Sequence, residues 1–247
     1  MIPIRDHNPS RRPAYVTWAL IAVSVAVFAY QSSLGDAGTL HFFDAWATVP
    51  GRISAGEGLV GLLTSMFLHA DLWHLAGNML FLWIFGDNVE DELGHVGFLA
   101  FYLACGALSA LAQVATAPTD LIPLVGASGA IAGVMGAYLL FFPRARIDIL
   151  IFLVVIVRIL PIPAWLMLAV WGAMQVINGL GTEAGGGGVA YWAHAGGMVA
   201  GIAIALPIWL RRGGRAFWRR TEGHPDHPPT AAPVTWRATT VPRVGRR

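Results

Sequence analysis

The chain has 247 residues, of which 56% are hydrophobic and only 12% are charged, and its formal net charge is +2. A soluble domain carries about 25% charged residues, so this composition excludes an ordinary soluble protein. Several apolar runs approach the ~20 residues that cross a ~30 Å hydrocarbon core. The runs are continuous rather than alternating, which excludes a membrane β-barrel. We therefore expect an all-α membrane protein.

The chain divides into three parts. Residues 1–14 are polar and predict a cytoplasmic tail, and we expect no cleavable signal peptide because the first apolar run is too long for one. Residues 15–210 predict a six-helix membrane core, and residues 211–247, rich in Pro and Arg, predict a disordered cytoplasmic tail. The six helices are expected at 15–34, 72–86, 95–115, 127–142, 161–179 and 190–210.

The apolar stretch 147–160 is the ambiguous segment. It is short, contains Arg158 and ends at a proline, so we interpret it as an interfacial or partly buried connection rather than a span. With six spans and a cytoplasmic N-terminus, fifteen of the sixteen basic residues lie inside and only Arg52 lies outside. This asymmetry fits the positive-inside rule. It predicts a plasma-membrane protein, such as one of a bacterial inner membrane, with both termini in the cytoplasm.

Unusual polar residues fall at similar depths on three of the predicted helices. His74 and Asn78 lie early in the second helix, Ser128 opens the fourth, and His194 lies near the start of the sixth. All three helices run from outside to inside in this topology. The fourth helix is short, about 24 Å at 1.5 Å per residue, so Ser128 is expected to lie below the outer surface. The loop before it would cap a cavity.

Small residues spaced four apart allow two membrane helices to approach closely. They occur in the fourth helix and again in the sixth, where His194 lies one turn before the first of them. A serine nucleophile needs a base within about 2.6–3.2 Å, and this arrangement would bring Ser128 and His194 together. The packing glycines are Gly129, Gly133, Gly197 and Gly201.

Attack by a serine on a peptide carbonyl creates an oxyanion. Backbone N–H groups at the start of the fourth helix are free of intrahelical partners and lie at the positive end of the helix dipole. His74 and Asn78 are four residues apart, on one helical face, and both side chains can donate hydrogen bonds. Most of these polar and glycine residues, taken alone, are more often packing residues in a membrane helix. Their joint occurrence at one depth favours a catalytic site.

Together the segments HADLWHLAGN (69–78), GASG (126–129) and AHAGG (193–197), with Gly201, resemble the rhomboid family of intramembrane serine proteases. The pattern Gly86-x-x-x-Glu90-x-x-x-Gly94 is also similar. The resemblance implies a six-helix rhomboid fold with a short, recessed fourth helix. It implies a Ser128 nucleophile, a His194 base, and an oxyanion hole formed by His74, Asn78 and the Ser128 N–H beside Gly126. His69 matches a further family histidine with a supporting role.

The resemblance also implies cleavage of transmembrane protein substrates in the bilayer, near their outer ends. No metal, cofactor or nucleic acid is expected, and Cys105 is interpreted as a packing residue. Some relatives carry an aromatic residue four positions after the serine, where this chain has Ala132. The imidazole must then be oriented by another group, for which we considered Tyr191 and Tyr138. We expect a dyad with no aspartate partner.

Other functional classes remain open at this point. A transporter or a chaperone-like binder could use the same polar cluster for a ligand. A zinc protease would need an HExxH motif, which is absent. An aspartyl protease would need two aspartates within the spans, and only Asp87, at a helix end, is a candidate. Tolerance of Ser128→Ala would favour the binder.

Overall fold

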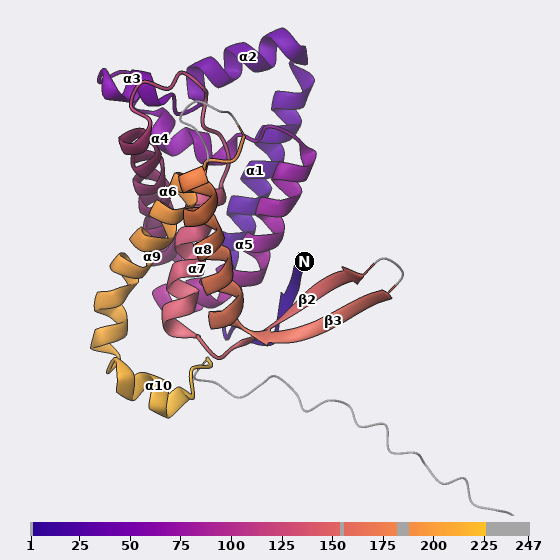
Figure 1. Ribbon diagram of the computed structural model, residues 1–247, viewed down its shortest axis with the longest axis vertical. Helices are drawn as coiled ribbons and strands as arrows, with labels where there is room; N and C mark the ends of the chain where they lie inside the picture. The colour runs from indigo at the N-terminus through magenta and orange to yellow at the C-terminus, as the bar shows by residue number, and fades with distance from the viewer. Residues whose placement is uncertain (1, 154–155, 182–187, 226–247) are drawn as a thin grey trace, which may run out of the picture.

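The computed structural model describes residues 2–153, 156–181 and 188–225. These residues form a bundle of helices with a three-stranded antiparallel sheet near one end (Figure 1). The strands are β1 (Ile2–Asp6), β2 (Arg146–Leu153) and β3 (Ile156–Pro163). The helices are α1 (Tyr15–Ser33), α2 (Gly35–Trp46), α3 (Pro50–Ser54), α4 (Gly61–Thr64), the 3-10 helix η1 (Ser65–Phe67), α5 (Leu72–Leu93), α6 (His95–Thr116), α7 (Ser128–Phe141), α8 (Ala164–Gly181), α9 (Tyr191–Arg211) and α10 (Arg215–Thr221).

A helix occupies each of the six predicted places. Four of them, α1, α6, α8 and α9, are long and apolar enough to cross a membrane, so the chain is a multi-pass membrane protein. The other two are α5, whose last turns are acidic, and α7, which has 14 residues and is about 21 Å long. A helix of that length is shorter than the ~30 Å hydrocarbon core. Six spans and a recessed fourth helix therefore stay predictions.

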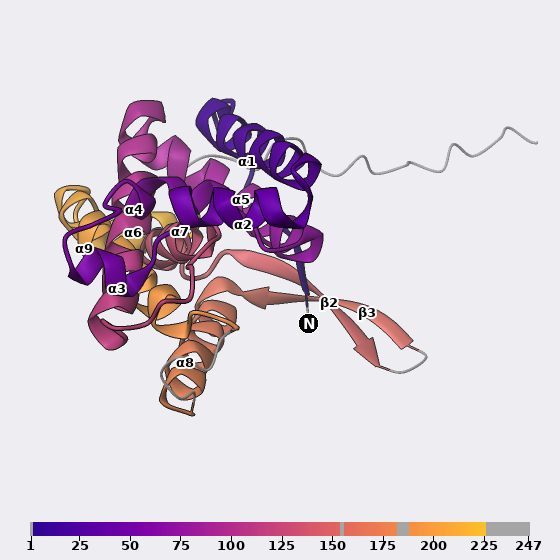
Figure 2. The same ribbon diagram turned by 90° about the horizontal axis from the view of Figure 1, so that it is seen from above.

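The expectation of an all-α fold is wrong near one end of the bundle. The stretch that we interpreted as an interfacial connection, 147–160, forms most of the β2–β3 hairpin, which projects away from the helices (Figures 1 and 2). Its sequence is rich in Ile and Val, and β-branched residues favour strands. Residues 2–6, predicted as part of a tail, pair with β2 as β1. The Asp148 carboxylate joins these strands by accepting hydrogen bonds from Arg5 Nε at 2.6 Å and His7 Nε2 at 2.8 Å.

The predicted C-terminal tail also contains ordered structure, because α10 follows α9 after a short turn. Residues 226–247 of that tail lie outside the described residues. The N-terminal strand, the hairpin and α10 lie toward one end of the bundle, and α2 and α3 lie at the other (Figure 1). Arg52 in α3 is therefore separated from the other described arginines, as the predicted sidedness requires.

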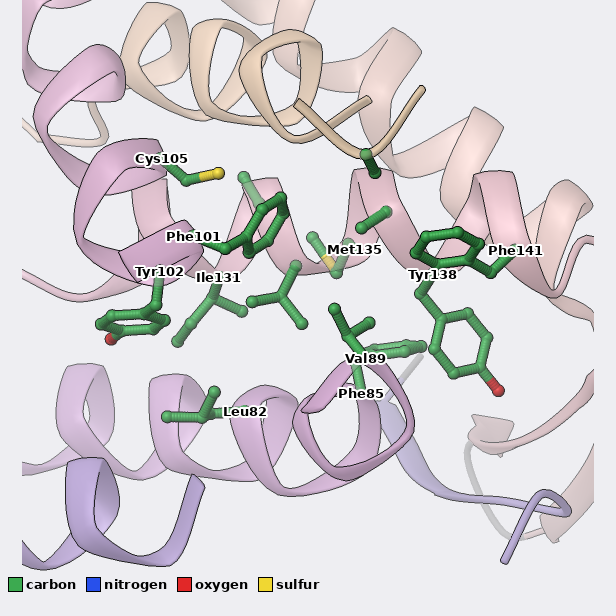
Figure 3. Close-up of a cluster of buried hydrophobic side chains, with 14 of the residues drawn as sticks. Leu82, Phe85, Val89, Phe101, Tyr102, Cys105, Ile131, Met135, Tyr138 and Phe141 are labelled. Carbon is green, nitrogen blue, oxygen red and sulfur yellow. The ribbon is translucent and has the colours of Figure 1, made fainter. Parts of the chain in front are cut away.

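Helix α7 lies inside the bundle and packs against α5, α6 and α9, and α6 and α9 also pack against each other. Residues 129–138 of α7 are all buried. In Figure 3, Met135 and Tyr138 of α7 lie near Phe85 and Val89 of α5, and Ile131 lies above Leu82 of the same helix. An apolar helix that is buried all round has no lipid-facing stripe, so its position is fixed by its neighbours rather than by the bilayer.

Helices α7 and α9 touch through their backbones. A Cβ atom at Gly197 would overlap the carbonyl oxygen of Gly129, and a Cβ atom at Gly201 would overlap that of Gly133. On α7, a Cβ atom at Gly129 would overlap Ser109 of α6. Side chains normally keep packed helices 8–10 Å apart. The glycines remove that spacer, so α7 packs tightly against both α6 and α9.

The Gly86–Glu90–Gly94 pattern connects α1, α5 and α6. A Cβ atom at Gly86 would lie 2.9 Å from the Thr17 side chain, so the glycine lets α1 cross α5 closely. The buried Glu90 carboxylate accepts hydrogen bonds from the backbone N–H groups of Val16 and Thr17, at 2.9 and 2.8 Å. It thereby caps the first turn of α1. Gly94, with φ of 70°, forms the turn between α5 and α6.

The contact between α7 and α9 gives a direct test of packing. We expect Gly201→Ala to lower the free energy of unfolding by about 2–3 kcal/mol, because the added methyl group must push the two helices apart. Gly97→Ala in α6 is the matched control, since its nearest neighbour would be 3.6 Å away and alanine favours helix. Thermal unfolding of both variants in detergent checks this. A Gly201→Ala protein as stable as the wild type would contradict it.

Candidate active site

The segment before α7 is held in place from outside the helix. Leu124 and Thr48 exchange backbone hydrogen bonds of 2.7 and 3.2 Å, and the Gly126 N–H donates to the Ser65 carbonyl at 2.9 Å. Gly126 has a φ of 118°, a conformation that favours glycine. A Cβ atom there would lie 2.6 Å from the His74 ring. The glycine therefore allows this loop to lie directly against α5 and fixes where α7 begins.

Ser128 is the first residue of α7, and His194 lies in the first turn of α9. The Ser128 Oγ atom is 2.7 Å from His194 Nε2, a hydrogen-bond distance. The glycine contacts between α7 and α9 begin just below this pair, at Gly129 and Gly197. The serine–histidine hydrogen bond therefore lies directly above the backbone contact between the two helices.

A cavity of about 700 Å³ opens beside this pair. Its wall includes Ser128, His194, residues 123–126 of the loop, and both His74 and Asn78 of α5. The Asp71 side chain caps α5 by accepting a hydrogen bond from the His74 N–H at 2.8 Å. The Asn78 amide nitrogen is buried and has no hydrogen-bond partner among the described residues. The starts of α5, α7 and α9 thus meet at one cavity.

His69 lies behind this site rather than in the cavity wall. It precedes α5, is fully buried, and packs edge-on against His74 with ring centroids 5.3 Å apart. Burial and, second, the nearby His74 ring lower the pKa of His69 to about 4, so the imidazole is neutral at neutral pH. Gln31 of α1 donates to the His69 carbonyl at 2.6 Å. These contacts fix the backbone from which α5 starts.

The sequence interpretation missed two residues of α8 that contact His194. Gln175 Oε1 lies 2.8 Å from His194 Nδ1, and the Trp171 ring lies beside the imidazole with centroids 5.7 Å apart and planes 33° apart. The suggestion that Tyr138 orients the His194 imidazole is wrong. The Tyr138 hydroxyl lies at the other end of α7, where it donates a hydrogen bond to Asp6 at 2.9 Å. Tyr191 makes neither hydrogen bond of the imidazole.

One signal in the sequence could have identified Gln175. Gln175 is an amide residue within an otherwise apolar helix, and the structure buries it. Burying a polar side chain inside a membrane helix costs free energy unless it has a hydrogen-bond partner. The helical spacing of four also places Trp171 and Gln175 on one face. That spacing could not show which neighbouring helix this face contacts.

The chain matches known proteins over its membrane core. A model of the Rhomboid domain matches residues 56–211. The chain is 30% identical to Rhomboid protein 1, mitochondrial, of Saccharomyces cerevisiae over 200 residues, 77% of this chain and 52% of that protein. It is 34% identical to Rhomboid protease GluP of Bacillus subtilis over 123 residues, 50% of this chain and 24% of that protein.

A third relative is the human presenilin-associated rhomboid-like protein, mitochondrial, with 38% identity over 93 residues, 36% of this chain and 24% of that protein. The chain spans about half or less of the length of these curated relatives. The Rhomboid domain match covers well over half of the chain and includes every residue that lines the cavity. The chain therefore belongs to the rhomboid family.

Proposed function

We propose that this protein is an intramembrane serine endopeptidase that uses Ser128 as nucleophile and His194 as general base. The observation that carries the proposal is the 2.7 Å hydrogen bond between Ser128 Oγ and His194 Nε2 at the wall of a cavity. Serine hydrolysis needs this contact. A packing serine would satisfy its hydroxyl on its own helix and would need no imidazole.

The reaction proceeds in two halves. Ser128 Oγ attacks the carbonyl carbon of the peptide bond while His194 Nε2 takes the hydroxyl proton, which gives a tetrahedral intermediate with a negative oxygen. The C–N bond then breaks, His194 returns the proton to the leaving amine, and an ester to Ser128 remains. A water molecule attacks that ester by the same steps and releases the carboxylate product and the free serine.

We further propose that Asn78 and His74 stabilise the negative oxygen, together with the Ser128 N–H. Asn78 Nδ2 is a buried donor without a partner among the described residues, and it lies beside Gly126 in the same cavity wall as Ser128. The first N–H groups of α7 also lack intrahelical partners. Preorganised donors of this kind stabilise charge that forms only in the transition state.

The substrates that this site favours are transmembrane segments of other proteins. A helix in the bilayer has its carbonyl groups bonded internally, so the segment must unwind locally before Ser128 can reach a carbonyl. Residues of low helix propensity near the cut would favour this. The arginine asymmetry supports a cytoplasmic location for both termini, and on this basis we propose that the cavity faces the outer side of the membrane. Mitochondrial relatives show that the family is not confined to that membrane.

Replacing either member of the Ser128–His194 pair tests the reaction. We expect Ser128→Ala and His194→Ala to lower cleavage of a transmembrane substrate in liposomes by at least about 10³-fold, because each removes a group that moves in the bond-breaking step. Thermal melts should show both variants folded. Labelling of Ser128 by a fluorophosphonate, located by mass spectrometry, is expected in the wild type only. Equal cleavage by all three proteins would contradict the proposal.

Asn78→Ala tests the stabilisation of the negative oxygen separately. Loss of one such donor typically lowers kcat by about 10²–10³-fold, and we expect KM to stay within about twofold because the donor acts on charge absent from the bound substrate. Asn78→Asp has nearly the same shape but turns a donor into an acceptor, so it should be at least as impaired. Steady-state kinetics in detergent measure both. Full kcat in Asn78→Ala would exclude this role.

A further inference from the structure

The imidazole of His194 is held between two hydrogen bonds from two different helices. Its Nε2 atom faces Ser128 Oγ at 2.7 Å, and its Nδ1 atom faces Gln175 Oε1 at 2.8 Å. Gln175 is 7% exposed and lies in α8, which packs beside α9. Each ring nitrogen therefore has one partner, and the partner at Nδ1 is an uncharged amide.

The orientation of that amide is fixed by its other end. Gln175 Nε2 donates to the carbonyl oxygen of Trp171, one turn earlier in α8, at 3.1 Å. Turning the amide over would place its oxygen against the Trp171 carbonyl oxygen, so that two acceptors would face each other. The carbonyl oxygen of Gln175 therefore faces His194.

This orientation determines the imidazole tautomer. An amide oxygen can only accept a hydrogen bond, so Nδ1 must carry the proton and donate it. In a neutral imidazole the other nitrogen, Nε2, then holds a lone pair, which faces the Ser128 hydroxyl. A base needs this lone pair to take the serine proton. In the opposite tautomer Nε2 would already be protonated and could not act.

We propose that Gln175 is the positioning residue of the catalytic histidine and holds His194 in the Nδ1–H tautomer, while the adjacent Trp171 ring limits its rotation. This inference rests on the proposed function, because it assigns Gln175 a role through His194. It also gives the site a neutral counterpart to the aspartate that holds the tautomer in other serine proteases. Among the described residues, no carboxylate makes a hydrogen bond to this imidazole.

The kinetic test compares three variants in full-length protein with a transmembrane substrate. Gln175→Met keeps the side-chain length but has no acceptor for Nδ1–H, and we expect kcat to fall about 10–100-fold with KM within about twofold. Gln175→Glu restores an acceptor, and its protonated form also restores a donor toward Trp171, so it should recover at least a third of the wild-type kcat. The matched control is Gln113→Met in α6, where Oε1 accepts from the Ala193 N–H at 3.2 Å without touching the imidazole.

Gln113→Met should keep kcat within about twofold. Wild-type kcat in Gln175→Met would overturn the proposal. An equal loss of kcat in Gln113→Met would also overturn it, because both substitutions would then act by disturbing the start of α9 in general. Failure of Gln175→Glu to exceed Gln175→Met would overturn it as well. Thermal melts of all variants establish that folded proteins are being compared.

A spectroscopic test does not depend on activity. In a Ser128→Ala background, Gln175 is the remaining hydrogen-bond partner of the imidazole, and ¹⁵N NMR of labelled histidine distinguishes the two tautomers. We expect His194, assigned by comparison with His194→Ala, to be protonated at Nδ1 with Gln175 present and to shift toward Nε2 protonation in Gln175→Met. An unchanged tautomer would overturn the proposal. If the wild type neither cleaves nor is labelled at Ser128, the proposed function fails, and this result still decides the role of Gln175.

Discussion

The backbone contact between α7 and α9 is the interaction around which the candidate site is built. The 2.7 Å hydrogen bond between Ser128 Oγ and His194 Nε2 crosses from α7 to α9, so its geometry depends on how these two helices pack. Gly129 and Gly197 lie directly below the pair and meet without side chains between them. In a bilayer, where lipid is as apolar as the helix surface, such close approach is itself a main source of helix association. The interaction that holds the bundle together therefore also sets the distance on which the proposed chemistry depends.

The site is also constrained by the loop 123–126, because it places non-helical backbone in the cavity wall. The loop 123–126 is anchored to the segment between α1 and α5 by the Leu124–Thr48 pair and the Gly126–Ser65 hydrogen bond. Irregular backbone at membrane depth is tolerated only when it is buried in protein or lines a wet cavity. If the loop lies at membrane depth as predicted, it meets the second of these conditions, because residues 123–126 line the cavity. The same hydrogen bonds hold Gly126 against His74 at the start of α7.

The helix positions and the convergence of the site residues could be predicted from sequence, because both depend on patterns within short stretches of the chain. The helix positions come from apolar length, and the convergence of Ser128, His74 and His194 follows from helix direction and arginine placement. The sheet was missed because the stretch 147–160 was interpreted from its length, its Arg158 and its prolines and not from its Ile and Val content. Pairing of residues 2–6 with that run joins segments about 140 positions apart, and no local pattern encodes such a contact. Gln175 was missed for a related reason, since its role depends on which face of α8 meets α9.

The chemistry of Gln175 fits its surroundings better than that of a carboxylate. A buried carboxylate needs compensating charge or several hydrogen bonds, and within a membrane protein that cost is larger still. The amide nitrogen donates to the Trp171 carbonyl, and the amide oxygen is left to accept from His194 Nδ1. In the proposed role, Gln175 holds the His194 tautomer without placing a negative charge beside the ring. It therefore lacks the additional stabilisation of the imidazolium that a carboxylate would provide.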